Sequence, residues 1–209
     1  MRNLLKELHR KYDVMELIRC INPLHGYRNY REARTDIMSG YPNARALKDY
    51  LAILPDSSSL AIYYVDLLGL HNINELAGKK TGNSAITFTL HNTEKAVSLF
   101  DGKVFREDRG DEIVAVVTNL DENNANLIHS KIRNLCKTYR HEQLPEDFQL
   151  NVAIGYAYSP RSDDPFSILD EVKEKASIDK AKFYEQYPEL ERRKHRDISD
   201  KKPLVQANR

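Results

Sequence analysis

Two apolar segments and the charged turn before the second of them constrain the fold most. Residues 60–66 read LAIYYVD, apolar up to a terminal aspartate, and IVAVV at 113–117 follows REDRGDE at 106–112. Apolar runs of this length bounded by turn residues are typical of buried strands. Four acids and two arginines surround Gly110, which indicates a turn at the surface. Residues 103–118 are therefore expected to form a hairpin of two strands.

Helical segments alternate with these strands along the chain. Helices are predicted at 3–20, 44–54, 89–100, 121–140 and 164–187, the last with Asp164 as its cap and Pro165 at its first position. A further strand is predicted at 148–159, a polar connector at 25–34, and breaks at Gly78 and Gly82. This order predicts an α/β (α+β) fold, a mixed sheet with helices on its faces.

Charge is distributed unevenly, and this limits the partners. The first 34 residues carry a formal charge of +4 and residues 189–209 carry +3; the net charge is +1, so the middle carries −6. We expect a helical extension at 1–34, a domain at 35–188 and a flexible basic tail at 189–209. An acidic domain is a poor nucleic-acid platform. No apolar run is long enough to span a membrane, and two distant cysteines without a metal-binding motif predict a cytoplasmic protein with reduced thiols.

Three acids are expected to lie at one edge of the sheet. Asp66 ends its strand, and Asp111 and Glu112 belong to the hairpin turn. If the strands are neighbours, the carboxylates converge and repel one another, a cost that a divalent cation with oxygen ligands would remove. The alternative is an ordinary acidic turn and a strand-end aspartate without a metal.

Five motifs, in order, resemble those of the GGDEF family, the diguanylate cyclases. TDIMSGYPNARAL (35–47) resembles the opening D-x-L-T-G-L-x-N-R-R, and VDLLGLHNINELAGKKTGNSAI (65–86) resembles D-x-D-x-F-K-x-I-N-D-x-x-G-H-x-x-G-D. RGDEI (109–113) stands in place of GGDEF, VAIGYA (152–157) resembles S-x-G-x-A, and KASIDKAKF (175–183) resembles A-D-x-A-L-Y-x-A-K.

The resemblance implies a polymerase-palm-like fold with a catalytic hairpin. It also implies a homodimer that joins two nucleoside triphosphates, most simply GTP, into a cyclic dinucleotide with Mg2+ or Mn2+. Asp66, Asp111 and the carbonyl of Leu67 would hold metal, with Glu112 assisting. The nucleotide-binding residues would be Asn74, Asn83, Arg109, Gly110 and, for the phosphates, Lys182.

Several positions depart from the family pattern. Arg109 replaces the first glycine of the signature, Leu70 and His71 replace its Phe-Lys pair, and Gln186 stands where a second phosphate-binding cation would be. An inhibitory R-x-x-D motif is missing, since Phe100 and Lys103 occupy its positions.

Asn83 replaces the aspartate that would accept both guanine N–H groups. An amide offers one acceptor and a donor group, a pattern that suits adenine. Asn83 therefore indicates weak discrimination for GTP, a preference for ATP, or a solvated residue in an inactive site. Two hypotheses follow: an active nucleotidyltransferase, or a degenerate module that regulates by binding a nucleotide or a protein.

Overall fold

The computed structural model describes residues 26–55, 58–107, 110–161 and 164–191. The helix predicted at 3–20, the turn residue Arg109 and most of the C-terminal tail lie outside these residues. The first described elements are helices α3 (Gly26–Ala33) and α4 (Ala44–Ile53). The segment predicted as a polar connector is thus largely the helix α3, because its arginines and glutamate are good helix formers despite their polarity.

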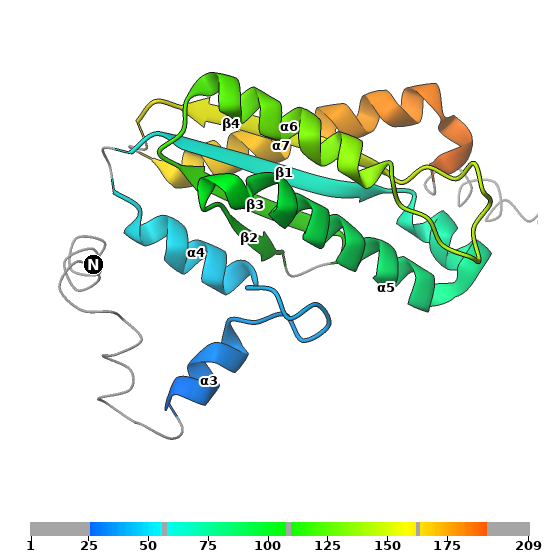
Figure 1. The fold of residues 1–209 in the computed structure, drawn as a ribbon, viewed down its shortest axis with the longest axis horizontal. Helices are drawn as coiled ribbons and strands as arrows, with labels where there is room; N and C mark the ends of the chain where they lie inside the picture. Colours follow the sequence, from blue (N-terminus) through cyan, green and yellow to red (C-terminus); the bar gives the residue numbers. More distant parts are fainter. Residues whose placement is uncertain (1–25, 56–57, 108–109, 162–163, 192–209) are drawn as a thin grey trace, which may run out of the picture.

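Four antiparallel strands form the centre of the fold (Figure 1). They are β1 (Leu60–Leu68), β2 (Lys103–Arg106), β3 (Glu112–Thr118) and β4 (Asn151–Ser159), in the spatial order β2-β3-β1-β4. The predicted fold class and the hairpin are confirmed. A mixed sheet was expected, but these four strands all pair antiparallel. Parallel pairing occurs among the described residues as an isolated bridge between Asn43 and Arg106.

Helices cover both faces of this sheet. Apolar residues of α5 (Leu70–Val97) and α6 (Glu122–Cys136) pack on one face with Ala61, Tyr63 and Val65 of β1. Residues of α4 and α7 (Pro165–Gln186) pack on the other face with Ile62 and Tyr64. Alternate residues of β1 therefore enter two separate cores, which is why the whole strand is apolar up to Asp66. Two short 3-10 helices, η1 (Ser98–Phe100) and η2 (Pro188–Leu190), complete the described elements.

Breaks were predicted at Gly78 and Gly82, ahead of a helix at 89–100, but α5 already begins at Leu70 and contains both glycines. The two glycines behave differently within it. Gly78 has φ +81° and ψ 163° and kinks the helix, as expected. Gly82 lies inside a helical turn, and the prediction of a break there is wrong. A Cβ at this position would overlap Oδ1 of Asn74, so any other residue here would push the Asn74 side chain away from its present position.

Helix α7 is held against β4 at a fixed position and rotation. The backbone of Gly155 in β4 contacts the backbone of Val172 in α7 directly, because a Cβ on Gly155 would lie 1.8 Å from the Val172 carbonyl oxygen. Asp179 Oδ2 accepts hydrogen bonds from the Ile154 amide (2.9 Å) and from Nη2 of Arg133 (2.8 Å). These contacts determine which side chains of α7 face the end of β1.

Candidate functional site

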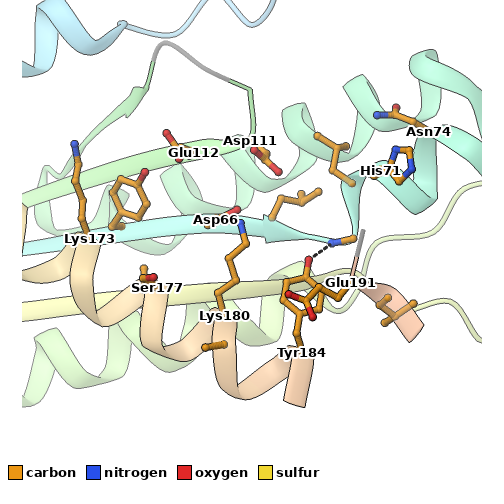
Figure 2. A pocket seen from close by; sticks show the side chains of 17 residues that line it. Asp66, His71, Asn74, Asp111, Glu112, Lys173, Ser177, Lys180, Tyr184 and Glu191 are labelled. Carbon is orange, nitrogen blue, oxygen red and sulfur yellow. Dashed lines mark hydrogen bonds and ion pairs between the residues drawn. The ribbon is translucent and has the colours of Figure 1, made fainter. Parts of the chain in front are cut away.

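A pocket of about 690 Å³ lies where β1, the hairpin, α5 and α7 meet (Figure 2). Its polar lining includes Asp66 at the end of β1, Asn74 of α5, Asp111 and Glu112 of the hairpin, Lys180 of α7, and Glu191 after η2. The three acids that the sequence predicted to converge therefore do line one pocket. Asp66 and Glu112 are directly paired residues of β1 and β3, so their side chains leave the sheet on the same face.

Asp66 is the most enclosed of these acids. Its exposed fraction is 8%, and Lys180 Nζ lies 2.6 Å from its Oδ2. The other oxygen, Oδ1, is buried and has no hydrogen-bond partner among the described residues. A buried carboxylate oxygen without a partner is costly, so this atom is available to a ligand that enters the pocket.

Asp111 is destabilised as an anion in the folded chain. Burial, and then the negative charge of Asp66, raise the pKa of its carboxyl to about 6. The Tyr64 hydroxyl lies in the same environment: burial, and the charge and hydrogen bonding of Glu112, raise its pKa. The pocket thus concentrates negative charge and would be stabilised by a cation.

Arg106 positions the hairpin turn, a role that the sequence did not reveal. Its exposed fraction is 7%, and its Nε and Nη2 donate to the Gly110 carbonyl at 3.1 and 2.7 Å. Its Nη1 lies 2.5 Å from Oδ1 of Asp36, which also accepts from the amide and hydroxyl of Ser39. Arg106 therefore ties the carbonyl before Asp111 to the turn at 36–39.

The structure does not bring every predicted nucleotide-binding residue to the pocket. Asn74 lines it, whereas Asn83 is exposed and does not. Lys182 is also exposed and outside the lining, whereas Lys180 of the same helix lines the pocket. Helical spacing gives the reason: Lys173, Ser177, Lys180 and Tyr184 follow one stripe of α7, which residue 182 does not join.

The remaining predicted residues can be placed only in part. Leu67 follows Asp66 and lines the pocket, consistent with a carbonyl ligand there. Gly110 has φ +105°, a conformation that favours glycine, and its carbonyl is taken by Arg106. Arg109 lies outside the described residues, so its contact with a nucleotide stays a prediction.

The donor atoms fit a hard divalent cation that shares its coordination with a substrate. Among the described residues, no group of three His, Cys, Asp or Glu side chains forms a metal site by itself. Mg2+ commonly binds through one or two carboxylates together with substrate phosphates. Asp66 with its unpartnered Oδ1, Asp111 and the Leu67 carbonyl provide such a partial set.

Comparison with known families matches residues 33–182 to the family described as "Diguanylate cyclase, GGDEF domain". This match spans most of the chain, so the chain belongs to the GGDEF family. No curated protein matches significantly. In the part of the chain that the structure describes, no helix has the length and apolar character needed to cross a membrane.

Solved structures of the same family share the fold. One of them is the structure of the coiled coil and GGDEF domain of DgcB from Caulobacter crescentus in complex with c-di-GMP. Its sequence is 16% identical to this chain, the TM-score is 0.64, and the alignment covers 84% of this chain and 94% of that one. Another is the structure of diguanylate cyclase SiaD from Pseudomonas aeruginosa in complex with its activator SiaC. Its sequence is 15% identical to this chain, the TM-score is 0.61, and the alignment covers 85% of this chain and 70% of that one.

Replacing Arg106 tests its positioning role. Arg106→Lys keeps the charge but cannot reach both the Gly110 carbonyl and Asp36 in the same way, which leaves buried polar groups unpaired. We expect the free energy of unfolding, measured with urea, to fall by about 1–3 kcal/mol. Arg34→Lys is the matched control, because Arg34 pairs with Asp49 at 2.6 Å in a more exposed setting and should cost under ~1 kcal/mol. Equal losses for both variants would contradict the role of Arg106.

The raised pKa of Asp111 predicts a pH-dependent gain from Asp111→Asn. The pKa of the carboxyl is about 6 in the folded chain against an ordinary value of 3.8, so ionisation destabilises the fold. With chelator present, the variant should be more stable than the parent at pH 8 by about 1–3 kcal/mol, at ~1.4 kcal/mol per pKa unit. The difference should shrink as pH falls through about 6 and vanish near pH 4. Exposed Asp170→Asn is the control; a constant difference across this range would refute the assignment.

Proposed function

We propose that this chain condenses two nucleoside triphosphates, GTP first, into a cyclic dinucleotide such as cyclic di-GMP. The observation that carries the proposal is the pair Asp66 and Asp111 in one pocket, with a buried Asp66 oxygen that has no partner among the described residues. Two acids that repel each other inside one pocket are expected where a divalent cation and phosphates bind together.

In this proposal each 3′-hydroxyl oxygen attacks the α-phosphorus of the other nucleotide. A new phosphorus–oxygen bond forms, the bond to pyrophosphate breaks, and the hydroxyl proton passes to solvent. Two such steps give one cyclic dinucleotide and two molecules of pyrophosphate. Catalysis of this kind depends mainly on positioning and on neutralising charge.

Each polar residue of the pocket has a proposed role in this reaction. Asp66, Asp111 and the Leu67 carbonyl would hold Mg2+ or Mn2+, which when bound offsets phosphate charge. Glu112 pairs with Asp66 across the strands and would contribute to the same acidic centre. Lys180 would move from Asp66 to a phosphate once a cation replaces it. Asn74 would contact the base.

The reaction joins two nucleotides, so we propose that two copies of the chain face each other during turnover. Residues 1–34, where α3 forms the last part, would provide the dimer or signal contact, and residues 189–209 would flank the domain. The preference for ATP that Asn83 indicated has little support, because this side chain is exposed and does not line the pocket. The cytoplasmic location stays a prediction.

A second candidate function is regulation without catalysis. The observation favouring it is the Lys180–Asp66 ion pair, in which the chain's own cation neutralises a proposed metal ligand. A module of this type would bind a nucleotide or a protein partner but make no product.

Replacing Asp66 separates the two candidates. The purified chain would be incubated with Mg2+ or Mn2+ and with GTP, ATP or both, and the products identified by mass spectrometry. We expect cyclic di-GMP from the parent chain and at least a ~100-fold lower rate for Asp66→Ala, the scale of losing a major electrostatic contribution. The exposed Asp170→Ala should retain the parent rate. Nucleotide binding without any product would favour the regulatory module, and full activity of Asp66→Ala would refute the site.

A further inference from the structure

Lys180 forms an ion pair with Asp66 that is enclosed on one side and open on the other. Its Nζ lies 2.6 Å from Asp66 Oδ2, and Figure 2 shows the lysine side chain extending from α7 to the end of β1. The exposed fraction of the side chain is 11% for Asp66 but 41% for Lys180, which lines the pocket. The acid is therefore held in place, whereas the ammonium has room to leave it.

The ion pair neutralises the acidic centre only in part. Asp66 Oδ2 accepts from Lys180, while the buried Oδ1 has no hydrogen-bond partner among the described residues. The carboxylate of Asp111 adds a second negative charge that acts on both Asp66 and Lys180. One ammonium group thus faces two acids, and a divalent cation with oxygen ligands would compensate them more fully.

A divalent cation and Lys180 compete for Asp66. Two positive groups on one carboxylate repel each other, so a cation binds poorly while Lys180 stays in place. If the cation displaces Lys180, the chain loses a charge-assisted hydrogen bond. Asp111 cannot replace Asp66 as the partner of Lys180 at the same time, because it is itself a proposed metal ligand. A cation alone should therefore bind weakly.

A triphosphate removes this conflict. Its oxygens can accept hydrogen bonds from the Lys180 ammonium and coordinate a divalent cation at the same time. The backbone of α7 need not move, since Asp179, the neighbour of Lys180, is held by the Ile154 amide at 2.9 Å. The transfer requires only a change in the flexible lysine stem, which already lines the pocket.

We propose that Lys180 makes cation binding depend on the nucleotide: it holds Asp66 until the phosphates of a nucleoside triphosphate accept its ammonium, so that the cation binds together with the nucleotide and not before it. This inference rests on the proposed function, since it concerns the same cation and the same nucleotide. Coupling between two ligands is reciprocal, so the cation in turn favours nucleotide binding by releasing Lys180. Without nucleotide, the chain's own lysine protects the acidic centre from divalent cations.

The variant Lys180→Gln in the full-length chain tests the proposal. Binding of Mn2+ alone would be measured from the electron paramagnetic resonance signal of the free ion. Binding of the Mn2+ complex of the α,β-methylene analogue of GTP would be measured by calorimetry. We expect the variant to bind Mn2+ alone at least about tenfold more tightly than the parent, and the complex about three- to tenfold more weakly.

The opposite signs of these two changes distinguish the proposal from simpler roles of Lys180. A purely structural lysine would weaken binding of both ligands when it is replaced. A lysine that stays on Asp66 when the nucleotide binds would, when replaced, tighten binding of both. Either result would overturn the proposal.

Two further variants assign the effect to this ion pair. Lys175→Gln removes the same charge from α7 and breaks an exposed pair with Glu171 (2.7 Å) outside the pocket, so it should bind both ligands like the parent. Adding Asp66→Asn to Lys180→Gln should abolish the gain in Mn2+ binding. A gain that persists in this double variant would place the ion elsewhere and overturn the proposal.

The parent chain provides a test that does not depend on the folding of any variant. It should bind Mn2+ alone much more weakly than the Mn2+ complex of the analogue. Equal affinities, or unchanged Mn2+ binding in Lys180→Gln, would overturn the role of Lys180 while leaving the proposed function intact. Failure of the parent to bind the complex would overturn both.

Discussion

Repulsion between Asp66 and Asp111 is the constraint on which the site depends. The fold encloses both acids in one pocket, and the cost is visible in the pKa of Asp111, raised to about 6 by burial and by the charge of Asp66. A purely structural role would favour a neutral residue in place of Asp111, because burial and the charge of Asp66 both disfavour its ionised form. A divalent cation held between them during function would neutralise both acids and would explain why they coexist.

Two separate parts of the fold hold this arrangement in place. Pairing of β1 with β3 sets Asp66 directly opposite Glu112, while Arg106 ties the Gly110 carbonyl to Asp36 and so fixes the turn that precedes Asp111. On the other side, the contact of Gly155 with α7 fixes the helix so that Lys180 reaches Asp66. The acids carried on such constrained elements would need little reorganisation to bind a cation, whereas Lys180 would have to leave Asp66.

The sequence predicted the parts of the site that depend on local pattern. The apolar runs identified β1 and the hairpin, and the family motifs brought Asp66, Asp111 and Asn74 together. The sequence did not predict the features that depend on the rotation of a helix about its axis or on contacts between residues far apart in the chain. The motif alignment assigned phosphate binding to Lys182. Helical spacing favours Lys180 instead, because it lies four and eight residues after the buried Ala176 and Val172, on the same side of α7. The Arg106–Asp36 pair joins residues 70 positions apart, and no local signal indicates it.

The central claim is that Asp66 and Asp111 hold a divalent cation together with a triphosphate. Crystals grown with Mn2+ and the α,β-methylene analogue of GTP would locate the metal directly through its anomalous scattering. The account predicts manganese bound to carboxylate oxygens of Asp66 and Asp111, with phosphate oxygens completing its coordination and Lys180 released from Asp66. A nucleotide in the pocket with no manganese at these two acids, or manganese bound elsewhere on the chain, would contradict it.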